Sequence, residues 1–283
     1  MDRAGPTMKA LARQVEQRWF GDGDPRFASV LRLAVFVVVV WLMAEVDLRY
    51  AGLPKGATVS VLGLVVPEDW WSEPTLLWLA RIGLIAGMGL WQVTRFKRVG
   101  AWLTVFGMLL LGSMYWENLP WFRHKFICPF WLLVLLAAAQ ARPCPPRWLR
   151  EAAIVVFAVF YAGAGIAKLL GSGLAWADGV GLQLWLFRLG DSNSWVRNWV
   201  VEDAGIAQLL ATASLVLELA VPLAVFWSRS RRALGLMLLA LHFGIDGILH
   251  IDFRPQMLLV ALVFCWPALP GKASARGTAP HPV

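Results

Sequence analysis

The feature that most constrains this chain is a series of apolar segments, each about long enough to cross a membrane. A helix needs about 20 apolar residues to span a hydrocarbon core of roughly 30 Å. Such segments recur along the whole sequence, at approximately 27–46, 76–93, 99–115, 126–141, 152–170, 206–227, 233–249 and 255–269. The fourth is short, and a further apolar block at 59–66 is expected to lie along the interface.

The composition also indicates a membrane protein, because 59% of the residues are hydrophobic and only 16% are charged. Soluble domains are about half apolar and a quarter charged. The segments lack the alternating pattern of outer-membrane strands, and a helix satisfies its own backbone groups in lipid. We therefore predict an all-α, polytopic integral membrane bundle of about eight transmembrane helices. We expect it to lie in the cell inner (plasma) membrane.

The distribution of lysine and arginine predicts the orientation, since cytoplasmic loops retain them in excess. Placing the N-terminus inside leaves 16 of the 26 basic residues in cytoplasmic segments and 7 outside, with Arg32, Arg81 and Lys168 within spans. Both termini are therefore expected to be cytoplasmic. The formal charge of +8 reports this topology and contact with anionic membrane lipids, and no nucleic-acid motif is present.

The sequence predicts one membrane domain, at 27–270, between a cytoplasmic segment at 1–26 and a disordered cytoplasmic tail at 271–283. Residues 1–26 lack the apolar stretch of a cleavable signal peptide, so the first span is expected to be retained. The three cysteines have neither zinc-site nor thioredoxin-like spacing. We expect no disulfide between Cys128, near the outer face, and Cys144, near the inner face.

Lys168 is the first polar group of chemical interest, because it lies at the end of the apolar run in "YAGAGIAKLLGSGLAWADG", residues 161–179. On a helix it shares a face with Tyr161, Ala164 and Gly165, and the small residues Ala164 and Gly165 beside one phenol predict space for a ligand. Burial disfavours the charged form of an amine, so such a lysine can act as a general base. The other interpretation is a lysine that snorkels to the outer interface.

Three histidines lie in the predicted spans or at their ends, and one of the carboxylates in these spans shares a helical face with two of them. His124, between Arg123 and Lys125, would open the fourth span and could accept or pass a proton. The other interpretation is an interfacial loop histidine beside two cations that bind lipid headgroups. His242, Asp246 and His250 follow one helical face at spacings of four. We interpret them as a buried polar network and predict no metal site.

Glu218, within "LVLELAVP", is an intramembrane carboxylate that could pair with Lys168 or with Arg81, and such an ion pair could be purely structural. Most of these polar groups are expected in the outer half of the membrane, although they come from separate spans. This arrangement predicts a pocket open to the outside.

These motifs together resemble the vitamin K-dependent gamma-carboxylase and the related horizontally transferred transmembrane (HTTM) proteins. "FYAGAGIAKL" followed by "WADG" is similar to the family's aromatic-Ala-Gly segment, Lys-Leu pair and Trp-x-x-Gly. "RHKF", "LELAVP" and "LHFGIDGILHIDFRPQML" resemble its histidine at a span start, its Glu-x-x-x-Pro helix and its histidine-containing helix. The opening "DPRFASVLRLAVFVV" is also similar, so the resemblance covers most of the chain in the family's order.

The resemblance implies that residues 27–270 are an HTTM-like domain in which Lys168 is the catalytic base and His124 assists it. The base would deprotonate a quinol of vitamin K type for reaction with oxygen, as in a carboxylase- or epoxidase-like oxidoreductase or lyase. Tyr161, Trp176, Asp178, Glu218, His242 and Asp246 are the predicted substrate-binding residues. Trp176 follows Lys168 at a longer spacing than in the family, and no large lumenal domain is evident, so carboxylation of a protein glutamate is not expected.

Two other hypotheses stay open at this point. The chain could be a non-catalytic subunit of a larger membrane complex, with the polar groups holding helices together and the 17 tryptophans acting as interfacial anchors. It could also be a small quinone-oxidase subunit of the DoxX or DoxD kind, although that four-span plan fits less well.

Overall fold

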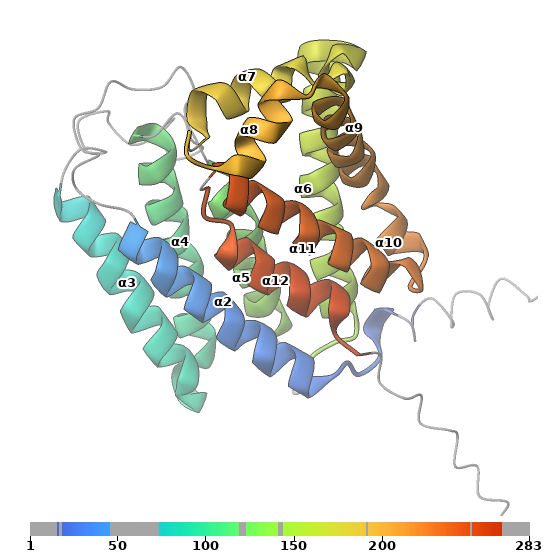
Figure 1. Cartoon of the computed structure of the whole chain (residues 1–283). Coiled ribbons are helices and arrows are strands. Elements are labelled where there is room, and N and C mark those ends of the chain that lie inside the picture. Colours follow the sequence, from blue (N-terminus) through green and yellow to red (C-terminus); the bar gives the residue numbers. More distant parts are fainter. Residues whose placement is uncertain are drawn as a thin grey trace, which may run out of the picture.

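The computed structural model describes residues 16, 19–45, 74–118, 123–140, 144–190, 192–249 and 251–267. This part of the chain is helical, and its one β-type contact is an isolated bridge between Asp22 and Pro146. The predicted all-α fold class is confirmed for these residues. Helices occur at every one of the predicted spans (Figure 1). The described helices are α2 (Pro25–Glu45), α3 (Pro74–Gln92), α4 (Lys97–Asn118), α5 (Ile127–Ala139), α6 (Trp148–Ser172), α7 (Val180–Leu189), α8 (Trp195–Glu202), α9 (Ala204–Ala220), α10 (Leu223–Phe226), α11 (Ser230–Leu249) and α12 (Arg254–Cys265), with the 3₁₀ turns η4 (Thr94–Phe96), η5 (Arg123–Phe126) and η6 (Gly173–Asp178).

Five of the described segments are long and apolar enough to cross a membrane, judged by length and composition: α2, α3, α6 with η6, α9 with α10, and α11. The chain is thus compatible with a multi-pass membrane protein. Helices α5 and α12 have only 13 and 12 residues, fewer than the approximately 20 of a full span. The count of eight spans and the orientation stay predictions.

The long helices pack around one apolar core. Its buried positions on α2, which include Phe27, Leu31, Val35, Val38 and Leu42, repeat every three or four residues and so form one helical stripe. The same core receives side chains from α3, α4, α5, α6, α11 and α12. Large apolar side chains such as Leu33 and Ile85 remain exposed on the outside of the bundle, as expected for helices whose outer faces contact lipid.

Glycines bring α3 and α4 together as a tight helical hairpin. A methyl group at Gly87 would lie 2.6 Å from the backbone nitrogen of Thr104, and one at Gly107 would lie 2.9 Å from Cγ of Leu84. Gly100 is equally close to the backbone of Trp91 and Leu90. Small residues at such contacts let membrane helices approach at backbone distance, where dispersion contacts are strongest.

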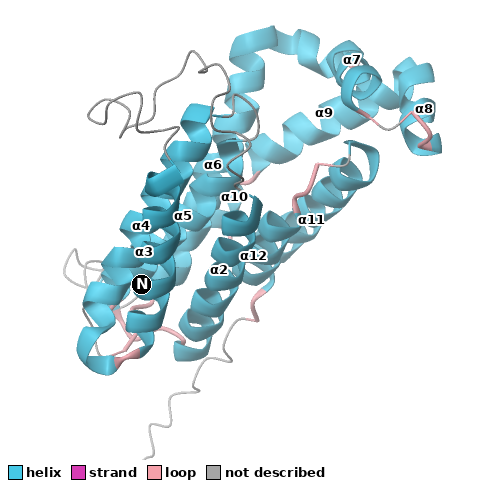
Figure 2. Cartoon of the chain, turned by 90° about the vertical axis from the view of Figure 1, so that its left-hand side faces the viewer, coloured by secondary structure: helices cyan, strands magenta, loops and turns pink. Residues whose placement is uncertain are grey.

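The segment between α6 and α9 contains α7 and α8, which lie at one end of the long helices (Figure 2). A second small core of Leu186, Val200 and Ala207 joins them to α9. The Arg197 side chain donates hydrogen bonds to the carbonyl oxygens of Leu186 and Phe187 at 3.1 and 2.9 Å, which satisfies the last turn of α7. Gln183 of α7 donates to the Val201 carbonyl of α8 at 3.0 Å. The two short helices therefore stabilise each other's C-terminal ends.

Candidate functional site

The centre of the candidate site is an ion pair between α6 and α9. Lys168 Nζ donates to Glu218 Oε1 at 2.6 Å, and the side chains are 24% and 10% exposed. The ammonium also lies 5.0 Å from the ring centroid of Trp176, in η6. Lysine, tryptophan and glutamate from three motifs separated along the sequence thus meet at one place.

Two glycines shape the approach of these segments. At Gly173 the backbone has φ of +59°, which ends α6 and allows η6 to return toward Lys168. At Gly179, φ is +85°, and a methyl group would overlap the backbone of Ala207 and Gln208 in α9. The glycine of "WADG" is therefore required both by its conformation and by the close contact with α9.

The small-residue face of α6 is not the empty space that the sequence suggested. A methyl group added at Gly165 would lie 3.0 Å from Cδ2 of Leu219 and 3.3 Å from Cβ of Glu218. The absence of a side chain at Gly165 lets α9 pack directly against α6, one turn before Lys168. The prediction of ligand space at this position was wrong because the neighbouring helix fills it.

Two buried polar atoms beside Lys168 lack a hydrogen-bond partner within the described part of the chain. They are Oε2 of Glu218 and Nε1 of Trp176, an acceptor and a donor, respectively. A buried polar atom without a partner is costly and calls for an explanation. A ligand that carries both a hydroxyl group and an oxygen acceptor would supply the missing partners.

A second buried polar pair links α6 to α11. The Tyr161 hydroxyl and Nε2 of His242 are 2.5 Å apart, and the ring of Phe253 stacks on His242 with centroids 4.6 Å apart. Tyr161 and His242 are 2% and 4% exposed. The structure therefore brings together two of the predicted site residues, and Tyr161 lies on α6 seven positions before Lys168.

The remaining predicted site residues have other surroundings. Asp178 is exposed and its Oδ1 accepts from the backbone nitrogen of Val180, the first residue of α7, at 2.8 Å. Asp246 is half-buried on α11, one turn after His242. His124 lies in η5, but its side chain and all of His250 lie outside the described residues. Within the described ranges, no group of three or more His, Cys, Asp or Glu side chains could hold a metal ion.

The structure also decides between the two partners considered for Glu218. Arg81 donates to the backbone carbonyl of Met43 at 3.1 Å and lies over the ring of Trp78. Lys168 is therefore the partner of Glu218. Sequence reasoning left this open because helical periodicity gives the face of a residue and not the neighbour of that face.

No protein-family model matches this chain, and neither a curated protein nor a solved structure does. The resemblance to the gamma-carboxylase and HTTM proteins thus depends on the motif residues alone.

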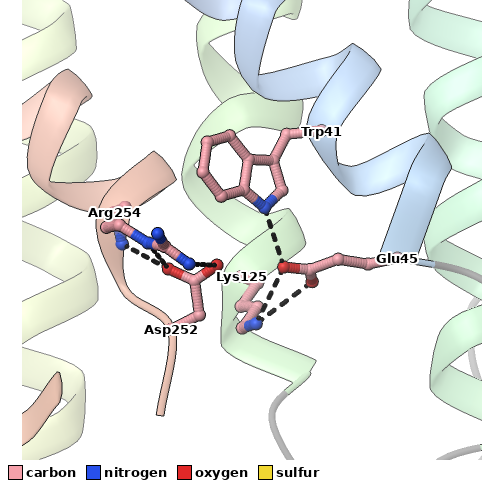
Figure 3. Close-up of polar contacts among 5 residues, drawn as sticks. All are labelled: Trp41, Glu45, Lys125, Asp252 and Arg254. Carbon is pink, nitrogen blue, oxygen red and sulfur yellow. Dashed lines mark hydrogen bonds and ion pairs between the residues drawn. The ribbon is translucent and has the colours of Figure 1, made fainter. Parts of the chain in front are cut away.

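A separate polar cluster at one end of the bundle was missed in the sequence. Glu45, at the end of α2, accepts hydrogen bonds from Trp41 Nε1 at 3.1 Å and from Lys125 Nζ at 3.1 Å (Figure 3). Beside it, Arg254 pairs with Asp252 at 2.9 Å, and its guanidinium lies 5.1 Å from the Trp41 ring centroid. The cluster ties the starts of α5 and α12 to the end of α2, and we assign it a structural role.

Proposed function

We propose that this chain is a multi-pass membrane protein whose Lys168–Glu218 pair is an acid–base site for a flat, apolar hydroxylated molecule of quinol type. We further propose eight spans, cytoplasmic termini and residence in the inner (plasma) membrane. The observation that carries the proposal is the buried Oε2 atom of Glu218, which has no hydrogen-bond partner within the described residues.

A quinol suits the three groups at this site. One quinol hydroxyl can donate to Glu218 Oε2, while the oxygen of a hydroxyl can accept from Trp176 Nε1. An apolar ring system suits the apolar residues of this region, which are the aromatic ring of Trp176 and the exposed side chains of Leu170 in α6 and Leu174 in η6. Leu170 and Leu174 are 84% and 81% exposed, so an apolar molecule dissolved in the bilayer can contact the surface beside the site.

The chemistry would begin with one proton transfer, after which dissolved oxygen would take two electrons and the second hydroxyl proton from the quinolate. With the proton returned from the site, the products are the quinone and hydrogen peroxide. In the ionic form of the pair the Glu218 carboxylate is the base: the quinol O–H bond breaks, an O–H bond forms at Oε2, and the electron pair remains on the quinol oxygen. If the proton first moves from the Lys168 ammonium to the Glu218 carboxylate, the neutral Lys168 amine is the base, as the resemblance implies. Either route leaves a quinolate whose negative charge is stabilised by a nearby positive or hydrogen-bonding group.

The resemblance supports this proposal through the residues that carry it. The Lys-Leu, Trp-x-x-Gly and Glu-x-x-x-Pro motifs contribute Lys168, Trp176 and Glu218. Lys168 contacts both of the others, although Glu218 is 50 positions away in the sequence. His242 of α11, from a further motif, contacts Tyr161, which lies on α6 with Lys168. A role for His124 as an assisting residue and a vitamin K-type quinone as the cofactor belong to this proposal.

The completed ion pair also favours a second candidate, a non-catalytic subunit in which Lys168 and Glu218 hold α6 against α9. A lysine already paired at 2.6 Å and placed over Trp176 has all the contacts that a structural cation needs. In this case the membrane-complex partner would be recognised through other surfaces, and no quinol would be needed.

The test is oxygen uptake by the purified protein in lipid nanodiscs with a reduced naphthoquinol, for wild type and for Lys168→Ala and Glu218→Gln. The proposal expects uptake in wild type and its loss in both variants. Lys125→Ala, which breaks the other Lys–Glu pair with Glu45, is the matched control and should retain uptake. Mass analysis of the extracted protein should recover a quinone from wild type.

The outcomes separate the two candidates. Uptake absent from all four proteins, with reduced stability only in the variants, supports the structural subunit. Turnover that persists in well-folded Lys168→Ala and Glu218→Gln proteins ends the acid–base proposal.

A further inference from the structure

A polar cavity lies at the opposite end of α2 from the Glu45 cluster, where α2, α4, α5 and the start of α6 meet. Its volume is about 130 Å³, and it is lined by Pro25, Ala28, Ser29, Arg32, Lys97, Leu136, Ala139, Gln140, Pro145 and Leu149. The four α2 residues of this lining follow one helical face at spacings of three and four. The cavity is built entirely from described residues.

Two cations line this cavity without a counter-charge. Arg32 and Lys97 are both half-buried, and neither forms an ion pair or side-chain hydrogen bond within the described part of the chain. Two acidic groups at this end have other partners: Asp24 accepts from Trp266 Nε1 at 3.0 Å, and Glu151 pairs with Arg231 at 2.6 Å. A third, Asp22 beside Pro146, is exposed and is not part of the cavity lining. Two half-buried cations facing one cavity repel each other unless an anion lies between them.

The other polar groups narrow the kind of anion. Ser29 adds a hydroxyl that can donate to an anionic oxygen. Gln140 donates from Nε2 to the Leu136 carbonyl at 3.3 Å, whereas its Oε1 is buried without a partner in the described residues. The cavity therefore offers two cations and a hydroxyl for an anionic group, and one acceptor for a neighbouring hydroxyl.

We propose that this cavity binds the phosphate group of an anionic phospholipid, with Arg32 and Lys97 on the phosphate and Gln140 Oε1 accepting from a headgroup hydroxyl. A glycerol phosphodiester such as phosphatidylglycerol has both features. The site lies at the end of α2 where that helix begins, among the loops richest in lysine and arginine, so a leaflet with anionic headgroups is the source of the ligand.

The experiment measures binding of short-chain phosphatidylglycerol, phosphatidylcholine and inorganic phosphate to the purified protein, by native mass spectrometry and by the thermal unfolding midpoint. Wild type should retain phosphatidylglycerol and gain thermal stability from it, and should not respond to phosphatidylcholine. Arg32→Gln combined with Lys97→Gln should weaken this binding about tenfold or more.

Two further variants keep the test decisive. Arg95→Gln with Arg98→Gln removes the same charge from exposed positions beside the cavity, and it should leave binding near wild type. Ala28→Leu fills the cavity without changing the charge and should abolish the preference for phosphatidylglycerol. Each variant is used only if its circular dichroism matches wild type.

If the two double variants lose phosphatidylglycerol binding equally, the lipid is attracted by the general positive charge of this end of the protein, and the proposed site is wrong. An equal response to phosphatidylglycerol and phosphatidylcholine, with no effect of inorganic phosphate, would also overturn it. Stabilisation by inorganic phosphate alone supports the phosphate site and overturns the lipid as its source.

Discussion

Arg231 and Glu151 form a two-pronged ion pair between α11 and α6. Nη1 and Nη2 of Arg231 donate to the two carboxylate oxygens of Glu151 at 3.0 and 2.6 Å. Nε of the same guanidinium donates to the Ala224 carbonyl of α10 at 2.9 Å. One arginine side chain, only 7% exposed, therefore joins α11 to the preceding helix α10 and to α6, which is about 80 positions earlier in the sequence.

Replacing Arg231 with leucine should lower the free energy of unfolding by about 3 to 5 kcal/mol, because Glu151 would lose its partner while it stays mostly buried. Denaturation of the purified protein in detergent, followed by circular dichroism, measures this change. Arg232→Leu alters the adjacent, exposed arginine and should have a much smaller effect. Similar decreases in the free energy of unfolding for the two variants would show that the contacts of Arg231 with Glu151 and Ala224 do not stabilise the fold.

Gly165→Leu should separate α6 from α9 and weaken the Lys168–Glu218 contact, since even a methyl group at this position is crowded by Leu219 and Glu218. We expect a destabilisation of about 1 to 3 kcal/mol from overpacking. Gly163, two residues earlier on the same helix, is exposed and has open space around it. Gly163→Leu is thus the control, and thermal unfolding of the two variants should differ clearly; equal midpoints would contradict the close packing.

The sequence predicted the positions of the long helices well because their signal is local: an apolar run of sufficient length. It also identified Lys168 and Glu218 as polar groups that need an explanation in a membrane. It did not identify Gly165 as a helix contact, because a glycine beside open space and one beside a packed helix have the same sequence signature. Only the packing of α9 distinguishes the two.

The Asp252–Arg254 pair gives a pH-dependent contribution to stability. Burial raises the pKa of Asp252, but hydrogen bonds and charge attraction from Arg254 more than offset this, and the pKa lies below its ordinary value. Because the folded-state pKa is lowered, the stabilisation is complete above the ordinary carboxyl pKa and is lost as the pH falls through the lowered pKa.

Thermal midpoints of wild type and Asp252→Asn, measured from pH 6 to pH 3, check this prediction. Wild type should be the more stable at pH 6, and the difference between the two proteins should shrink as the pH decreases. A difference that grows toward pH 3 would mean that Asp252 is destabilising when charged, opposite to the direction expected.

The orientation prediction is that both termini lie in the cytoplasm, from the excess of lysine and arginine in alternate loops. A reporter that is active only in the periplasm should be inactive when fused after Val283. The same reporter inserted at Ser192, between α7 and α8, should be active. The reverse pattern would place the Lys168–Glu218 site on the other side of the membrane.

Helices α7 and α8 show the limit of prediction from apolar runs. The segment was not among the predicted spans, because "WVRNWVVE" has no long apolar stretch and its apolar residues are interrupted by Arg197 and Asn198. Trp195 and Trp199 are 75% and 54% exposed in α8, while Val200 enters the small core shared with α7 and α9. This amphipathic pattern is typical of a helix lying along an interface, and it was the available signal.

The shortness of α5 affects how the bundle would fit a membrane. This helix packs against α2, α4 and α6, and at a rise of 1.5 Å per residue its 13 residues cover about 20 Å. Lys125 lies just before its first residue, and the Arg32, Lys97 and Gln140 cavity lies at its last turn. In a membrane about 30 Å thick, a helix of this length would leave about 10 Å of hydrocarbon unmatched, so the bilayer would have to thin around α5 or its flanking polar groups would lie below the headgroups.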